Sequence, residues 1–253
     1  MTSVSGNLAT EQRLDRLREV LERDGSLRLA DVAVELGVSE MTVRRDLQQL
    51  ESLGVARRVR GGAVALTPTA FADRHKAHAR AKSKIAAKLV DLVPATGAVG
   101  VDASSTVMRM SRMLEPRREL TVITNGLEAF HAIAAVPGVR PVLTGGELDP
   151  RTGSLVGPLA AHSAGQLMLR RLFLSSAGVD PVLGTGETCL EEAEVKQALA
   201  RVSEDVVLAV DSSKLGARGT ALGLAWEQVR VLVTDLEPSS PRLDAYRDQV
   251  ELL

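Results

Sequence analysis

The chain has 253 residues, which is room for one small domain and one larger domain. It is 45% hydrophobic with a formal net charge of −1, so overall charge indicates no particular partner. No apolar run approaches the roughly 20 residues of a membrane span, and the N-terminus lacks a signal-peptide pattern. A single cysteine, Cys189, excludes an intrachain disulfide and is interpreted as an ordinary small residue rather than a nucleophile. We therefore expect a soluble, cytoplasmic protein with no membrane partner.

Two helical patterns and a tight turn come first along the chain. The first helix ends at Asp24-Gly25, and its apolar residues recur at helical spacing: Leu14, Leu17, Val20 and Leu21. A second, short helix is predicted over residues 29–36. Gly37-Val38 then forms the turn into a third helix. Short helices joined by a glycine-containing turn are typical of a helix-turn-helix.

The third helix carries groups that can recognise DNA. Ser39 is a suitable N-cap, because its side-chain oxygen can accept a hydrogen bond from an otherwise unpaired backbone N–H. One apolar stripe, at i, i+4 and i+7, consists of Val43, Leu47 and Leu50. The opposite face and its edges present Met41, Thr42, Arg44, Arg45, Gln48 and Gln49. Arginine and amide side chains near a helix N-terminus match guanine and adenine edges in a major groove.

A basic hairpin follows this helix. Residues 55–64 have the pattern of a two-stranded wing, whose arginines can contact phosphates: Arg57, Arg58 and Arg60. Between residues 37 and 66 there are five basic and three acidic residues, whereas residues 1–66 as a whole are balanced. The arginines can also be ordinary solvated charges, but their placement favours DNA binding. We expect a winged helix-turn-helix domain over residues 1–66.

A long pattern of residues supports this interpretation. Its positions are Arg13, Leu17, Gly25, Leu36-Gly37-Val38-Ser39, Thr42-Val43-Arg44-Arg45-Asp46-Leu47, Leu50, Gly54, Arg58 and Gly61-Gly62-Ala63. The pattern resembles the DNA-binding domain of the DeoR family of bacterial transcription regulators. The resemblance implies that Thr42, Arg44 and Arg45 contact DNA, and that Asp46 holds an arginine or caps locally.

The rest of the chain indicates an α/β domain. Residues 67–80 lack strong periodicity and are expected to be a linker to a domain over residues 81–253. There, short apolar runs cover 98–101, 120–123, 139–143, 172–174, 206–210 and 229–233. Helical patterns lie between them, near 105–114, 126–136, 158–170 and 190–202. This alternation predicts a mostly parallel, Rossmann-like sheet with helices on both faces.

Polar or glycine-rich turns follow five of these runs, at the edge where open α/β sheets bind ligands. The candidate effector-binding residues are Asp102, Ser104, Ser105, Thr106, Asn125, Gly126, Gly145, Gly146, Gly178, Glu194, Lys196, Asp211 and Lys214. Ser104–Thr106 begin a helix, whose N–H groups and hydroxyls can hold an anion such as phosphate. Lysine is scarce, with six against 25 arginines, so Lys196 and Lys214 are informative sources of positive charge. Lys196 can instead pair with Glu192, four residues earlier.

The resemblance extends into this second domain. It rests on Arg74, Lys84-Ile85-Ala86, Asp102-x-Ser104-Ser105-Thr106, Thr121-Val122-x-Thr124-Asn125, Gly145-Gly146, Gly157, Gly178, Gly186, Glu194-x-Lys196 and Asp211-Ser212-Ser213-Lys214. These positions look like the DeoR effector domain, similar in fold to ribose-5-phosphate isomerase and glucosamine-6-phosphate deaminase. The resemblance implies a sensor of a phosphorylated sugar. Ser104, where the family commonly has glycine, and Glu187-Thr188-Cys189 depart from the family pattern, which leaves the ligand's identity open.

Together these patterns predict a transcriptional repressor of a sugar operon. We expect a homodimer or homotetramer that binds a double-stranded DNA operator and is released by a phosphorylated sugar. No catalytic residues, cofactor or metal site are expected, since the four histidines are scattered. Two alternatives are a phosphosugar isomerase or deaminase with a fused DNA-binding domain, and an activator that binds DNA more tightly with its ligand.

Overall fold

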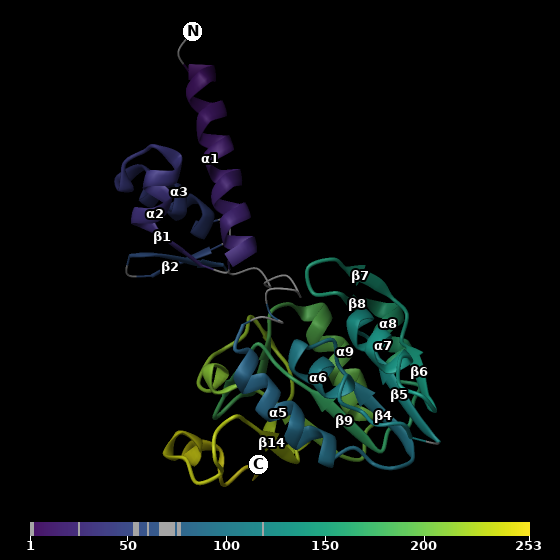
Figure 1. The fold of residues 1–253 in the computed structure, drawn as a ribbon. Coiled ribbons are helices and arrows are strands. Elements are labelled where there is room, and N and C mark those ends of the chain that lie inside the picture. The colour runs from purple at the N-terminus through teal and green to yellow at the C-terminus, as the bar shows by residue number, and fades with distance from the viewer. Residues whose placement is uncertain are drawn as a thin grey trace. The chain divides into compact units, whose positions relative to one another are not determined.

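The computed structural model describes residues 3–24, 26–52, 56–59, 61–65, 74, 77–117 and 119–253. The chain divides into two compact units, Met1–Arg74 and His75–Leu253, and each is considered by itself (Figure 1). In the described ranges, no helix is both long enough and apolar enough to span a membrane.

The first unit consists of three helices and a small antiparallel sheet. The helices are α1 (Ser3–Asp24), α2 (Leu29–Leu36) and α3 (Glu40–Ser52). The sheet has the order β1-β3-β2, with β1 (Ser26–Arg28), β2 (Ala56–Val59) and β3 (Gly62–Ala65). The three helices and the β2–β3 hairpin confirm the predicted elements. Strand β1 was not predicted, because three residues are too few to show a strand's alternation.

Two glycines permit the tight connections of this unit. Gly37 ends α2 in the left-handed region, at φ 64°, where glycine avoids the steric cost of a side chain. Gly62 lies against β1, and a Cβ there would be 2.0 Å from the carbonyl oxygen of Leu27. Around them, the apolar stripes of the helices form one buried core that includes Leu17, Leu21, Val43, Leu47 and Leu50.

The second unit is built on a seven-stranded parallel sheet, which confirms the predicted α/β class. Its order is β15-β14-β12-β9-β4-β5-β6. The strands are β4 (Gly97–Val101), β5 (Leu120–Thr124), β6 (Val139–Leu143), β9 (Arg171–Leu174), β12 (Val206–Ala209), β14 (Val231–Val233) and β15 (Glu251–Leu252). All six neighbouring pairs are parallel, so the carboxyl ends of the strands meet at one edge.

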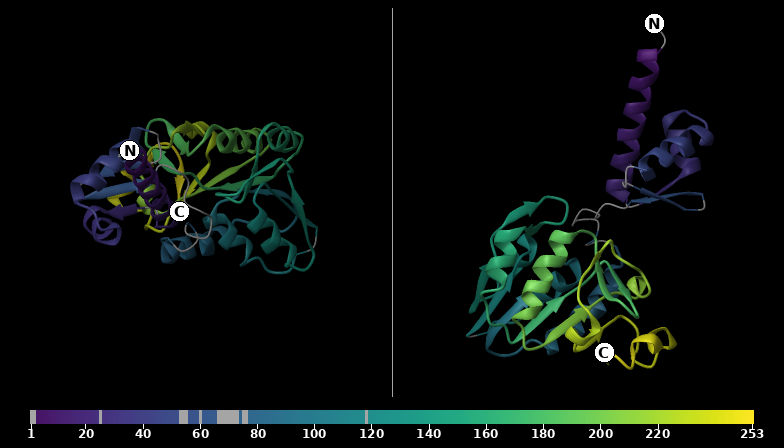
Figure 2. Two further views of the ribbon diagram at one scale, coloured as in Figure 1. Left: turned by 90° about the horizontal axis from the view of Figure 1, so that it is seen from above. Right: turned by 180° about the vertical axis from the view of Figure 1, so that it is seen from behind.

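Helices cover both faces of this sheet (Figure 2). One face carries α5 (Ala79–Asp91), α6 (Ser105–Ser111) and α7 (Leu127–Ala134). The other carries α8 (Pro158–Ala164) and α9 (Leu190–Arg201). Because both faces are covered, side chains of the central strand β9 such as Phe173 and Leu172 are fully buried.

Short elements that the sequence did not predict lie beside the carboxyl edge. They are the hairpin β7 (Glu147–Asp149) and β8 (Ser154–Val156), and the antiparallel sheet β10 (Gly178–Asp180), β11 (Gly184–Glu187) and β13 (Ala221–Leu222). The last strand predicted from an apolar run, over residues 229–233, is shorter than that run: β14 covers Val231–Val233 and follows a 3-10 turn over Trp226–Gln228.

Candidate nucleic-acid interface and effector site

The start of α3 has the geometry expected of a capped helix. The Ser39 hydroxyl accepts the Thr42 backbone N–H at 3.2 Å, which confirms Ser39 as the N-cap. It also shares a 3.0 Å hydrogen bond with the Thr42 hydroxyl, so the Thr42 side chain is engaged locally. The apolar stripe of α3 is buried. The opposite face is exposed and presents Met41, Arg44, Arg45 and Gln48.

The described arginine side chains between residues 13 and 58 fall into two groups. Some are paired with carboxylates: Arg13 with Asp46, Arg16 with Glu35, Arg18 with Asp15, and Arg58 with Glu51. The Arg13–Asp46 pair, at 2.8 Å, confirms that Asp46 holds an arginine. The side chains of Arg28, Arg44 and Arg45 are exposed and make no hydrogen bond or ion pair with another described residue. Within the described ranges, no carboxylate therefore competes with a phosphate or a base for these guanidinium groups.

The predicted wing arginines have different surroundings. The Arg58 guanidinium lies 2.6 Å from a Glu51 carboxylate oxygen, and the Arg58 backbone N–H donates to the other oxygen at 3.0 Å. These hydrogen bonds lower the pKa of Glu51. Arg57 is paired with Val64 in the strand register, but its side chain, like the whole of Arg60, lies outside the described residues.

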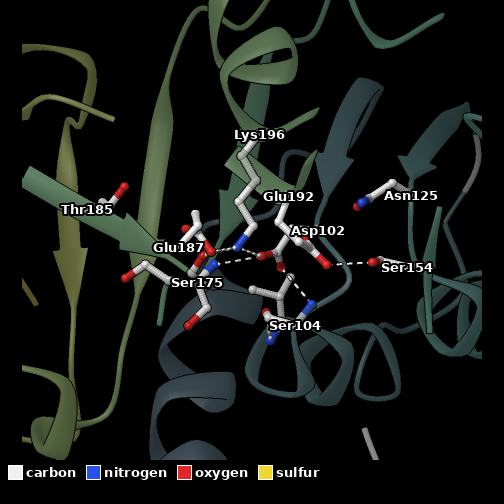
Figure 3. A network of polar contacts seen from close by, with 12 residues as sticks. Asp102, Ser104, Asn125, Ser154, Ser175, Thr185, Glu187, Glu192 and Lys196 are labelled. Atoms are coloured by element: carbon white, nitrogen blue, oxygen red, sulfur yellow. Dashed lines mark hydrogen bonds and ion pairs between the residues drawn. The ribbon is translucent and has the colours of Figure 1, made fainter. Parts of the chain in front are cut away.

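In the second unit, Asp102 joins two turns at the carboxyl edge of the sheet (Figure 3). Its side chain is fully buried and follows β4 directly. One carboxylate oxygen accepts the Ser104 N–H at 3.1 Å, and the other accepts the Ser175 N–H at 3.0 Å. Ser175 follows β9, the neighbouring strand. Asp102 therefore ties the turns after two adjacent strands to each other.

Lys196 extends from α9 into the same network, where Figure 3 shows it between two carboxylates. Its ammonium donates to Glu187 Oε2 at 2.7 Å and lies 3.4 Å from Asp102 Oδ2. Burial alone would lower the pKa of Lys196, but the two carboxylates outweigh burial and raise it. Burial raises the pKa of Glu187 to about 7. Lys196 is thus a buried ammonium that is already neutralised.

Glu192 lies beside this group but has a different partner. The Ser154 hydroxyl of β8 donates to Glu192 Oε1 at 2.5 Å, a contact that Figure 3 also shows. The alternative pairing of Lys196 with Glu192 is not observed, because Lys196 contacts Glu187 and Asp102 instead. Sequence spacing could not show this, since β11 carries Glu187 to Lys196 only in the folded chain.

Lys214 is the second lysine at this edge, in the 3-10 turn Ser212–Lys214. Its ammonium donates to the Ser175 hydroxyl at 3.2 Å and to the Ser176 carbonyl at 2.5 Å. Burial lowers the pKa of Lys214. Within the described ranges Lys214 has no carboxylate in ion-pair contact, so its charge is less compensated than that of Lys196.

Three buried acceptor atoms at this edge have no donor among the described residues: Asn125 Oδ1, Glu187 Oε1 and Asp211 Oδ2. The three side chains are at most 4% exposed. Asn125 uses its amide group to donate to the Leu155 carbonyl at 3.2 Å, and in Figure 3 its side chain points from its own turn toward the network. Buried acceptors are nearly always paired, so these atoms suit a molecule that brings hydrogen-bond donors.

The remaining predicted residues divide into neighbours of the network and structural positions. The Ser105 hydroxyl contacts the buried ammonium of Lys82 at 3.2 Å, and Thr106 is buried. Gly178 is structural, because a Cβ there would lie 2.5 Å from the Ala217 carbonyl oxygen. The Glu194 side chain is exposed on α9 and has no hydrogen bond or ion pair in the described parts of the chain.

The glycines after β5 and β6 serve the backbone of the turns. Gly126 packs against the turn after β4, since a Cβ would come within 2.7 Å of the Ala103 Cα. Gly145 and Gly146 have φ values of 76° and 116°, which side chains rarely allow. Residues of the network that the predicted site omitted are Lys82, Ser154, Ser175 and Glu187.

Comparison with known proteins identifies the two units. Residues 13–69 match the DeoR-like helix-turn-helix domain, and residues 77–236 match the DeoR C terminal sensor domain. The chain belongs to the DeoR family. This DeoR-family regulator is 31% identical over 235 residues to the uncharacterized HTH-type transcriptional regulator YulB of Bacillus subtilis, covering 90% of this chain and 91% of that one. It is 30% identical over 230 residues to the lactose phosphotransferase system repressor of Staphylococcus epidermidis, covering 88% of this chain and 91% of that one.

Two solved structures show a distant likeness to the DeoR-family chain. Ribose 5-phosphate isomerase A from Methanocaldococcus jannaschii aligns with a TM-score of 0.37 at 16% identity, over 53% of each chain. The tetrameric eIF2B beta-delta complex of C. thermophilum aligns with a TM-score of 0.48 at 15% identity, over 68% of this chain and 61% of that one. Likenesses of this level say nothing about what the chain binds.

Proposed function

We propose that this regulator represses an operon of carbohydrate metabolism and leaves its operator when a phosphorylated sugar binds at the sheet edge. The names of two relatives support this assignment: the lactose phosphotransferase system repressor and the putative aga operon transcriptional repressor of Escherichia coli O157:H7. The observation that carries the sugar assignment is the set of three buried acceptors without donors, on Asn125, Glu187 and Asp211.

The chemistry of those acceptors suits a polyhydroxylated ligand. Each sugar hydroxyl can donate one hydrogen bond, and a buried acceptor left without one costs about 1–3 kcal/mol. Hydroxyls on Asn125 Oδ1, Glu187 Oε1 and Asp211 Oδ2 would relieve that cost. The phosphate would lie against Lys214, whose ammonium contacts only neutral oxygens among the described residues. Lys196 would position Asp102 and Glu187 rather than contact the phosphate.

We further propose that the chain senses the sugar without converting it, and that it acts as a homodimer or homotetramer on repeated half-sites. For ligand binding to release DNA, the sugar must favour the low-affinity conformation. Moving an equilibrium from 1:99 to 99:1 takes about 5.5 kcal/mol of differential binding. Several donors on otherwise unpaired acceptors, together with one phosphate contact, are of the right order for that difference.

A DNA-release assay tests this proposal. The full chain is bound to a duplex selected from a random library, then titrated with ribose-5-phosphate, fructose-6-phosphate, galactose-6-phosphate or glucosamine-6-phosphate and with the same sugars lacking phosphate. We expect one phosphosugar to release the DNA and its unphosphorylated form to have little effect. Tighter DNA binding with the sugar would support an activator instead. Turnover of any phosphosugar by the purified chain would support the fused-enzyme alternative.

A further inference from the structure

Met41 is an apolar side chain on the polar face of α3. Among residues 40–51 of this helix, the exposed positions are otherwise charged or amide-bearing: Glu40, Arg44, Arg45, Gln48 and Gln49. Met41 is 64% exposed, so it contributes little to the core of the first unit. It does not cap the helix either, because Ser39 provides that hydrogen bond. The local fold therefore gives no reason for a methionine at this position.

The placement of Met41 on the helix gives a reason. It is the second residue of α3 and lies one turn before Arg44 and Arg45, at i+3 and i+4. Residues at these spacings share one face of a helix. Both arginines are exposed and unpaired within the described residues. The thioether thus lies on the same face as the guanidinium groups of Arg44 and Arg45, on the side opposite the buried stripe.

The major groove offers one apolar group to such a face. Arginine matches the acceptors of guanine and glutamine matches adenine, whereas the 5-methyl group belongs to thymine alone among the four bases. A flexible, polarisable thioether adapts well to a methyl contact. We propose that Met41 recognises a thymine in each operator half-site by covering its 5-methyl group. This inference rests on α3 as the helix that recognises DNA.

Uracil differs from thymine only by the missing methyl, so replacing one by the other isolates the contact. The probe is a duplex selected from a random library by the wild-type full chain, with each thymine replaced in turn by uracil. Burial of one methyl-sized group corresponds to about a fourfold change in affinity. We expect wild-type affinity to fall about fourfold at one half-site position, and Met41→Ala to bind thymine and uracil equally there. Met41→Leu should retain the preference for thymine.

Two further variants keep the test decisive. Val34→Ala removes another exposed apolar side chain, on α2, and should leave every thymine-to-uracil ratio unchanged. Arg45→Ala tests whether α3 contacts the operator. If Arg45→Ala weakens binding but no thymine-to-uracil effect depends on residue 41, the thymine assignment is wrong. If Arg45→Ala also has no effect, α3 does not recognise the operator and the inference fails together with that premise.

Discussion

At the scale of single residues, what distinguishes the candidate contacts is whether a charge is already paired. Arg45 and Arg18 are both exposed arginines, but Arg18 lies 3.0 Å from Asp15 whereas Arg45 has no carboxylate partner in the described parts of the chain. Lys214 and Lys196 differ in the same way at the sheet edge. An unpaired cation attracts a phosphate without competition, whereas the charge of a paired cation is already partly neutralised by its carboxylate.

Arg45→Ala should therefore weaken operator binding by about 1–3 kcal/mol, because it removes a base or phosphate contact. Arg18→Ala is the matched control and should leave operator affinity unchanged. Fluorescence anisotropy with a labelled operator measures both. Equal effects of the two substitutions would contradict the distinction between free and paired arginines.

Lys214→Ala should abolish the response to the phosphosugar while leaving operator affinity intact, because the phosphate loses its cation. Lys84→Ala removes an exposed lysine of α5 and serves as the control. The measurement is DNA release as a function of sugar concentration. A normal response in Lys214→Ala would remove this lysine from the proposed site.

The titration of Glu187 makes a prediction for stability. Its folded pKa, about 7, lies above its ordinary value of 4.5, so the folded state binds the Glu187 proton more tightly than the unfolded chain does. This group's contribution to stability is complete below pH 4.5 and is lost as the pH rises to about 7 and above. Glu187→Gln should flatten the pH dependence of the unfolding free energy between pH 4.5 and 7. Urea melts at each pH give that free energy. If it changes with pH by the same amount in wild type and variant, the pKa of Glu187 is not raised.

At the scale of elements, close backbone contacts determine where strands can pair. Strand β1 joins the wing only because Gly62 leaves room for the Leu27 carbonyl oxygen. The periodic parts of the fold were predictable, since the stripe of Val43, Leu47 and Leu50 is a local pattern. Strand β1 and the β10-β11-β13 sheet were not, because their two- to four-residue strands pair through tertiary contacts.

Gly62→Ala tests the contact between β1 and β3. A Cβ 2.0 Å from a carbonyl oxygen forces the strands apart, which we expect to destabilise the first unit by about 1–3 kcal/mol and to weaken DNA binding. Gly165→Ala is the control, because a Cβ there meets its nearest atoms at 3.5 Å. Thermal unfolding measures both. A Gly62→Ala variant as stable as wild type would show that the strands adjust without cost.

At the scale of the whole molecule, the order of strands along the sheet brings together residues that are distant in sequence. Asp102 and Ser175 meet because β4 and β9 are neighbours, and this was predictable in outline from turns that follow buried strands. Glu187 was not predictable as a partner of Lys196, because β11 places it there through tertiary structure. Whether the positive charge of Lys196 is available to a ligand could not be judged from sequence, since its two carboxylate partners appear only in the fold.

Reciprocal binding measures the proposed link between sugar and operator most directly. Linkage requires that, if the sugar weakens operator binding by some factor, the operator weakens sugar binding by the same factor. Calorimetric titration of the full chain with the releasing phosphosugar, with and without saturating operator, gives that factor. We expect a weaker sugar affinity with operator present, by the factor found in the DNA-release assay. Equal sugar affinity in both titrations would contradict the proposal that the sheet edge controls DNA binding.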